Sequence, residues 1–250
     1  MKLFLRLFFL LGISFMLIQL YFLIKIVLMV AIAPQSTSFE RSEIWRIVTH
    51  QGSLPWRQEW VPYENISVQL KRAVIASEDG DFINHDGVEW EAIEQAWQKN
   101  AKAQDIAEKR LKKASTNNKS STKIIKPPKI IGGSTISQQL AKNLFLSGER
   151  TLLRKGQEFV ITQLLEIFLT KQRILEIYMN SVEWGEGVFG AEAASQHYFR
   201  KPAKLLTSYE AARLAVMLPR PKYFEKQSTS SYLSGRATSI VARMVDAEVP

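Results

Sequence analysis

The segment that decides the fold is GGSTISQQLAKN at residues 132–143. Two glycines open it, and Thr135 followed three residues later by Gln138 fits a capping box, the pattern of a helix N-terminus. From Ile136 onward an apolar residue recurs at every fourth position. The spacing therefore predicts an amphipathic helix that runs to about Leu146.

The polar side of this predicted helix is a candidate ligand surface. Its amide and ammonium groups suit a polar ligand better than they suit core packing. Free N–H groups at a helix N-terminus also favour anions. A solvated helix face explains the same pattern equally well, and the position of the lysine does not fit a P-loop. The residues concerned are Ser134, Thr135, Gln138, Gln139 and Lys142.

Helical periodicity also governs most of the remaining chain, and no segment shows the strict alternation of a strand. Thr207 and Glu210 form a second capping-box pattern. Residues 34–65 contain Pro34, Pro55 and Pro62 and are expected to be irregular. The sequence thus predicts a mostly α-helical protein. The other expected helices span residues 66–79, 88–113, 151–169, 171–180, 191–199 and 208–218.

The N-terminal segment is long and apolar enough to cross a bilayer. Residues 7–24 carry no charge, and the apolar run resumes after Lys25 and continues to Ala33. The alternative is a cleaved signal peptide, since Ala31 and Ala33 form a small-x-small pattern. The length of the run and Pro34 directly after that pattern favour a retained anchor.

The charge around this anchor predicts its orientation. Lys2 and Arg6 precede the apolar run, so the positive-inside rule places residues 1–6 in the cytoplasm. The transmembrane anchor is expected at 7–33. Residues 34–250 are then expected outside the cytoplasm.

The distribution of charge limits the other function classes. The formal net charge is +9, of which residues 1–33 carry +3 and residues 99–129 carry +8, so the remainder is −2. The folded body is therefore not basic, and no nucleic-acid partner is expected. The chain has no cysteine, which excludes a disulfide framework, a thiol nucleophile and a cysteine-ligated metal.

An acidic cluster at residues 78–86 is the first candidate for chemistry. Four carboxylates lie there, one serine after the apolar residues 73–76. A carboxylate at a helix end beside apolar walls is poorly hydrated, so its pKa rises. Such a group suits a general base or acid near neutral pH. An acidic helix end that turns into a loop is the competing interpretation.

A basic cluster is the second candidate. Arg150, Arg154 and Glu158 are four residues apart and share one helix face. Together with Lys142 and Lys155 they form a group suited to a phosphate or pyrophosphate. An ordinary surface ion pair explains the spacing as well.

Four motifs follow one another in an order that is more specific than any one of them. This order, over roughly residues 66–224, resembles that of the peptidoglycan glycosyltransferases, the murein polymerases. Because no penicillin-binding domain follows, the resemblance is strongest to their monofunctional, membrane-anchored members. The motifs are residues 78–87 (EDGDFINHDG), 133–143 (GSTISQQLAKN), 154–158 (RKGQE) and 174–180 (ILEIYMN).

The resemblance implies a lysozyme-like, two-lobed fold and the polymerisation of lipid II with release of undecaprenyl pyrophosphate. Glu78 matches the catalytic base of an inverting transfer, and Glu158 matches the second, supporting carboxylate. Lys142, Arg150 and Lys155 match basic positions near the donor pyrophosphate. The other implied substrate-binding residues are Asp79, Phe82, His85, Ser134, Thr135, Gln138, Gln139, Asn143 and Arg154.

The resemblance also implies domain boundaries, partners and a cofactor. Residues 34–65 are expected to connect the anchor to a glycosyltransferase domain at 66–224, and 225–250 to form a helical tail. Residues 100–129 are expected to be a mobile basic insert. The charge of +8 over residues 99–129 predicts contact with anionic lipid headgroups, and a solvated, disordered insert explains the same composition equally well. The expected partners are lipid II, the growing glycan strand, membrane lipids and other cell-wall synthesis proteins. Family members often use Mg²⁺ or Mn²⁺ at the pyrophosphate, but no metal-ligand spacing is evident here.

Two other functions share part of this pattern. A lysozyme or lytic transglycosylase would use the same acidic residue to cleave glycan, but it needs no pyrophosphate-binding cations. A non-catalytic membrane-tethered scaffold would explain Gly80, which stands where the family commonly has a larger polar residue. The presence of both carboxylates and of the basic cluster argues against the scaffold.

Overall fold

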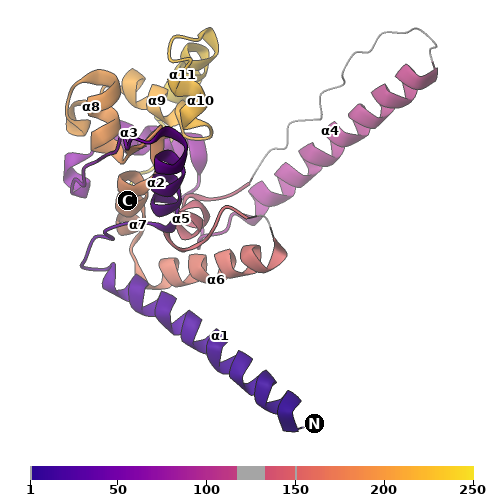
Figure 1. Cartoon of the computed structure of the whole chain (residues 1–250). Coiled ribbons are helices and arrows are strands. Elements are labelled where there is room, and N and C mark those ends of the chain that lie inside the picture. The colour runs from indigo at the N-terminus through magenta and orange to yellow at the C-terminus, as the bar shows by residue number, and fades with distance from the viewer. Residues whose placement is uncertain (1, 117–132, 150) are drawn as a thin grey trace. The chain divides into compact units, whose positions relative to one another are not determined.

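A computed structural model describes residues 2–116, 133–149 and 151–250 of the chain, shown in Figure 1. Two compact units make up the chain. The larger consists of Met1–Gly87 together with Thr135–Pro250, and the smaller is Val88–Ser134. The expected mostly α-helical fold is confirmed in both.

The larger unit is built from helices with two short 3-10 turns, η1 (Tyr63–Asn65) and η2 (Ala203–Leu205). Its core packs α3 against α9 and α9 against α11, while α5 packs against α6 and α7. The helices are α1 (Lys2–Leu28), α2 (Ser38–Gln51), α3 (Val68–Glu78), α5 (Ile136–Phe145), α6 (Leu152–Phe168), α7 (Lys171–Ser181), α8 (Ala191–Phe199), α9 (Ser208–Met217), α10 (Pro221–Glu225) and α11 (Ser231–Arg243).

Helix α2 corrects the expectation that residues 34–65 are irregular. Thr37 caps its N-terminus by accepting a hydrogen bond from the Glu40 amide at 3.0 Å. The Glu40 carboxylate accepts one from the Thr37 amide in return, at 2.7 Å. Gly52 ends the helix in the left-handed conformation, with φ of 65°. The prolines of this segment lie outside the helix, so they do not interrupt it.

A small sheet is present in the larger unit, although no segment of the sequence shows the alternation of a strand. Strands β1 (Arg57–Gln58), β2 (Glu183–Gly185) and β3 (Val188–Phe189) lie in the order β1-β3-β2. β1 is parallel to β3, and β2 is antiparallel to it. Strands of two or three residues are too short to show alternation in sequence. Gly187 allows the tight turn into β3, with φ of +70° and the Pro55 carbonyl directly against it.

Helix α1 is the single helix in the described part of the chain that is long and apolar enough to cross a membrane. The side-chain amides of Gln19 and Gln157 of α6 donate to each other at 2.9 and 3.0 Å. Ile26 is fully buried, and Arg173 Nε of α7 donates to the Met29 carbonyl at 2.8 Å. The C-terminal end of α1 is thus fixed to the larger unit, while most of its length is exposed.

The smaller unit consists mainly of helix α4 (Trp90–Thr116). The helix expected at 88–113 is confirmed, and it continues three residues into the segment expected as a loop. Its exposed apolar side chains include Trp90, Trp97 and Ile106. Residues 117–129 of the expected basic insert lie outside the described residues.

Candidate active site

Glu78 is the last residue of α3, and two neighbours bind its carboxylate. Gln139 Nε2 of α5 donates to Oε2 at 3.0 Å, and Ser77 Oγ donates to Oε1 at 3.4 Å. Burial raises the pKa of Glu78, the two hydrogen bonds lower it, and the charge of Asp79 raises it further. Burial dominates, so the pKa is above the ordinary glutamate value.

Tyr178 of α7 fixes the orientation of the Gln139 amide. Its hydroxyl donates to Gln139 Oε1 at 3.0 Å, which leaves the amide nitrogen of Gln139 to face Glu78. Burial raises the pKa of Tyr178 well above its ordinary value, so the phenol stays protonated and remains a donor. Three helices therefore hold one carboxylate in place. Sequence reasoning missed Tyr178 as a partner because it lies 39 residues from Gln139.

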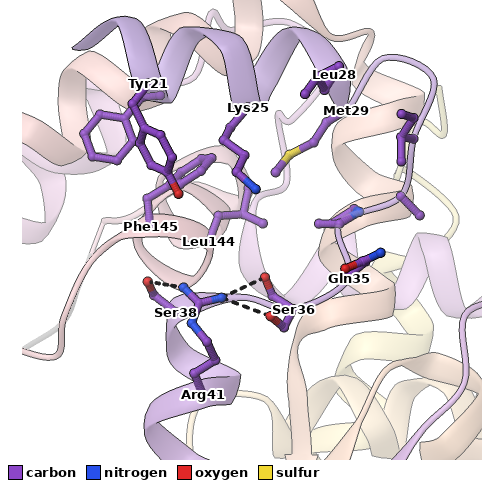
Figure 2. A pocket seen from close by; sticks show the side chains of 14 residues that line it. Tyr21, Lys25, Leu28, Met29, Gln35, Ser36, Ser38, Arg41, Leu144 and Phe145 are labelled. Carbon is purple, nitrogen blue, oxygen red and sulfur yellow. Dashed lines mark hydrogen bonds between the residues drawn. The ribbon is translucent and has the colours of Figure 1, made fainter. Parts of the chain in front are cut away.

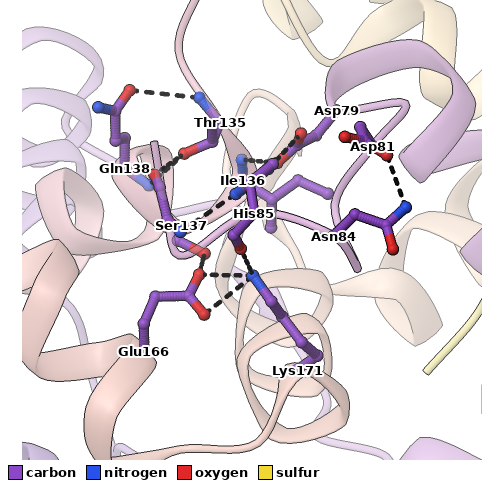
Figure 3. Close-up of polar contacts among 11 residues, drawn as sticks. Asp79, Asp81, Asn84, His85, Thr135, Ile136, Ser137, Gln138, Glu166 and Lys171 are labelled. Atoms are coloured by element: carbon purple, nitrogen blue, oxygen red, sulfur yellow. Dashed lines mark hydrogen bonds and ion pairs between the residues drawn. The ribbon is translucent and has the colours of Figure 1, made fainter. Parts of the chain in front are cut away.

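Asp79 joins the acidic cluster to the start of α5 (Figure 3). Its Oδ1 binds His85 Nε2 at 2.8 Å, and its Oδ2 accepts from the Ile136 amide at 2.8 Å. The Gly87 amide donates to His85 Nδ1 at 3.1 Å. This assigns the imidazole proton to Nε2, where it points at Asp79. Asp79 is 3% exposed and both its oxygens are used, so it positions the two motifs against each other.

A second, half-buried group supports this loop and was not found from sequence (Figure 3). Lys171 Nζ donates to Glu166 at 2.9 Å and to the His85 carbonyl at 2.5 Å. Ser137 Oγ donates to the same Glu166 carboxylate at 2.5 Å. Lys171 also lies 4.7 Å from the ring centre of Phe82. These residues come from separate segments, so their spacing in sequence gives no sign of the group.

Several expected substrate-binding residues have structural contacts instead of an open surface. Thr135 and Gln138 form the predicted capping box of α5, and Thr135 Oγ1 also donates to the Gly87 carbonyl at 2.6 Å. Phe82 is fully buried in the core, and Asn143 is 7% exposed. Among the second-motif residues, Gln139 and Lys142 remain accessible on α5.

Glu158 of α6 is buried between two cations. Arg154 Nη1 donates to its Oε2 at 2.7 Å, and Lys155 Nζ pairs with its Oε1. Glu158 is 3% exposed, and its carboxylate holds both cations in this arrangement. Ser134 belongs to the smaller unit, and Arg150 lies outside the described residues.

The expected divalent cation has no obvious set of protein ligands. Within residues 2–116, 133–149 and 151–250, no three His, Asp or Glu side chains gather closely enough to hold a metal. Both oxygens of Asp79 and both of Glu158 already have partners. The described side chains therefore do not by themselves form such a site.

Comparison with known proteins gives the family. The transglycosylase family model matches residues 47–245. A biosynthetic peptidoglycan transglycosylase of Burkholderia thailandensis is 50% identical over 93% of this chain and 82% of its own. Proteins of the same name from Paraburkholderia xenovorans and Herminiimonas arsenicoxydans are both 46% identical. These alignments cover 96% and 94% of this chain, and 90% and 92% of the relatives.

These matches agree with the helical architecture and with the order of the four motifs. The family match spans the glutamate of α3, its amide partner on α5 and the cation pair on α6. The lysozyme-like fold class expected from the resemblance is thereby confirmed. The chain belongs to the transglycosylase family and is a glycosyltransferase.

Proposed function

We propose that this chain polymerises lipid II into peptidoglycan strands for bacterial cell-wall synthesis and releases undecaprenyl pyrophosphate. The observation that carries the proposal is the carboxylate of Glu78, whose pKa is raised by burial and whose orientation is set by Gln139. The relatives named above are called peptidoglycan transglycosylases, which supports the same substrate class.

In the proposed reaction Glu78 acts as general base. It takes the proton of the 4-hydroxyl of the acceptor GlcNAc as that oxygen forms a bond to C1 of the donor MurNAc. The bond from C1 to the pyrophosphate oxygen breaks, the electron pair leaves with the pyrophosphate, and the configuration at C1 inverts. A base with a raised pKa transfers protons more effectively near neutral pH than an ordinary carboxylate does.

The cations of α5 and α6 would stabilise the leaving pyrophosphate. Arg154 and Lys155 are held by Glu158, and Lys142 is exposed on α5. Charges fixed in advance stabilise a developing anion without reorganising at the moment of reaction. Arg150 is assigned to the same group on the resemblance alone.

The membrane helix supports a lipid-linked substrate. A single-span anchor keeps the enzyme in the plane in which the lipid tail of the substrate moves. Lys2 and Arg6 before the span favour a cytoplasmic N-terminus in the inner membrane and a domain on the periplasmic side. Other cell-wall synthesis proteins are proposed as further partners on the resemblance alone.

The test is to incubate the detergent-solubilised full chain with labelled lipid II and to resolve the products. Polymer is expected from the native chain and from Glu59→Gln, which removes an exposed carboxylate. None is expected from Glu78→Gln. Polymer from Glu78→Gln would overturn the role of the base. No polymer from a folded native chain would favour the scaffold, and cleavage of preformed glycan would favour the hydrolase.

A further inference from the structure

A pocket of about 380 Å³ opens where α1 ends, between that helix, the start of α2 and the end of α5. Figure 2 shows it from close by. Apolar walls come from Tyr21 and Phe22 of α1 and from Phe145 of α5. The edge-to-face contact of Phe22 and Phe145, at 5.3 Å between ring centres, joins two of these elements. The pocket thus has a built apolar side.

Two cations line the same pocket. Lys25 extends from α1 toward the guanidinium of Arg41 on α2 (Figure 2). That guanidinium donates to the Ser36 carbonyl at 3.2 Å, to Ser36 Oγ at 3.0 Å and to Ser38 Oγ at 3.1 Å. Its position is therefore fixed by neutral oxygens.

The charge of these cations is not neutralised inside the pocket. No acidic residue lines it. The carboxylate of Glu40 interacts with the charge of Arg41 from outside the pocket, and it is buried and bound to the Thr37 amide and to Gln58. Within the described ranges, Lys25 forms no ion pair. The pocket is therefore a cationic site with an apolar wall, a combination that fits an amphipathic anion.

The place of the pocket on the anchor indicates which anion. The 18 uncharged residues 7–24 rise about 27 Å as a helix. This matches the roughly 30 Å of a hydrocarbon core. With residues 7–24 of the expected anchor across the core, Lys25 lies at the depth of the headgroups, where phosphates are the anions present, and residues 26–33 lie beyond it. The apolar wall then faces the first part of an acyl chain.

We propose that this pocket binds the phosphate headgroup of an anionic membrane phospholipid, with one acyl chain along α1. The proposal depends on α1 as the membrane span, but it does not depend on Glu78 or on the reaction proposed above. Lys142, Arg154 and Lys155, which are proposed to hold the substrate pyrophosphate, do not line the pocket. This favours a resident phospholipid over the substrate lipid.

The experiment places the full chain in nanodiscs that contain equal amounts of phosphatidylglycerol and phosphatidylcholine. Native mass spectrometry then measures the lipid retained by the released protein. The native chain should retain one phosphatidylglycerol in preference to phosphatidylcholine. Lys25→Gln should lower that retention about fivefold, and Lys25→Gln/Arg41→Gln roughly 25-fold, since each basic residue near a membrane surface contributes about that factor.

A matched variant controls for the loss of two charges. Lys204→Gln/Arg236→Gln removes two exposed cations far from the anchor in sequence, and it should retain the lipid as the native chain does. Lys25 is exposed and unpaired with any acid in the described residues, so Lys25→Gln provides a test even where the double variant fails to fold.

Three outcomes would overturn the proposal. Equal retention by the native chain and Lys25→Gln would show that the pocket does not select the lipid. Displacement of phosphatidylglycerol by equimolar undecaprenyl pyrophosphate would assign the pocket to the substrate lipid. Displacement by equimolar inorganic phosphate would assign it to free phosphate.

Discussion

Glu78 has consequences for stability as well as for activity. Its pKa is raised in the folded chain, because burial outweighs the hydrogen bonds from Gln139 and Ser77. Between the ordinary glutamate pKa and the raised value, the native state binds more protons than the unfolded state does. Stability contributed by this group is therefore fully present at low pH and is lost as pH rises through the raised pKa.

The first prediction is that Glu78→Gln raises the melting temperature of the protein at pH 7. The neutral amide keeps the shape of the side chain without the cost of a buried charge. The difference should vanish below about pH 4, where the carboxyl is protonated in both states. Thermal unfolding of both proteins in detergent, from pH 7 to below about pH 4, measures the difference in melting temperature. Glu59→Gln, an exposed control, should not change the melting temperature, and a lower melting temperature for Glu78→Gln would contradict the argument.

The second prediction concerns the pH dependence of polymerisation. The hydrogen bond from Gln139 stabilises the ionised form of Glu78 and lowers its pKa. Gln139→Ala should therefore raise the pKa further and shift the acid limb of kcat/KM to higher pH, in addition to lowering the rate. Gln196→Ala, which removes an amide-to-carboxylate hydrogen bond on α8, should leave the acid limb in place. An unshifted limb in Gln139→Ala would mean that another group controls it.

Residue types in sequence predicted part of this site. The apolar run before Glu78 was enough to predict a poorly hydrated carboxylate. The role of Asp79 in bonding to the start of α5 was not predictable, because its partners lie 6 and 57 residues away. Phe82 was expected to bind substrate because it lies within a motif, but in the structure it is fully buried in the core.

At the scale of elements, capping boxes were the most reliable local pattern. Two of them predicted the starts of α5 and α9, and both are present. The same pattern at Thr37 and Glu40 starts α2, but the prolines around it gave the whole segment an irregular appearance. The short strands were beyond sequence reasoning, since their pairing joins residues 57–58 to 188–189.

The third prediction contrasts two glycines in different elements. An added Cβ at Gly187 would lie 2.0 Å from the Pro55 carbonyl, at a φ of +70°. Gly187→Ala should therefore destabilise the fold by about 2 kcal/mol or more, because backbone must move and the left-handed conformation is strained. Gly235 lies inside α11 with nothing within 4 Å of such an atom. Gly235→Ala should stabilise by roughly 1 kcal/mol.

Denaturant unfolding of both variants in the same detergent measures this contrast. A Gly187→Ala variant as stable as the native chain would show that the turn before β3 can shift to accommodate a Cβ at little cost in free energy. The free energy of unfolding is expected to rise in Gly235→Ala and to fall in Gly187→Ala. A general effect of an added methyl group would change both in the same direction.

At the scale of the whole molecule, α6 is expected to share the membrane with α1. It contacts α1 at Gln19, which lies within the uncharged run of the anchor. Leu152 and Leu153 of α6 are 92% and 89% exposed, an apolar patch that water does not favour. Part of the larger unit should therefore enter the lipid.

The fourth prediction follows from this patch. A chain that lacks residues 1–33 should still sediment with liposomes, and Leu152→Ser/Leu153→Ser in that chain should abolish the binding. Burying each leucine contributes about 2 kcal/mol. Leu205→Ser/Val245→Ser, at exposed apolar positions of η2 and after α11, is the matched control and should still bind. Circular dichroism confirms that each variant is folded, and binding by the α6 variant would contradict the membrane contact of this helix.

The paired amides of Gln19 and Gln157 constrain the order in which the protein is assembled. The ribosome makes Gln19 138 residues before Gln157, so the anchor enters the bilayer while its amide still lacks this partner. An unpaired amide in hydrocarbon is unfavourable, and a helix that arrives later at the membrane surface relieves it. Biogenesis should therefore proceed from insertion to docking, and the last step in forming the native enzyme should take place within the lipid.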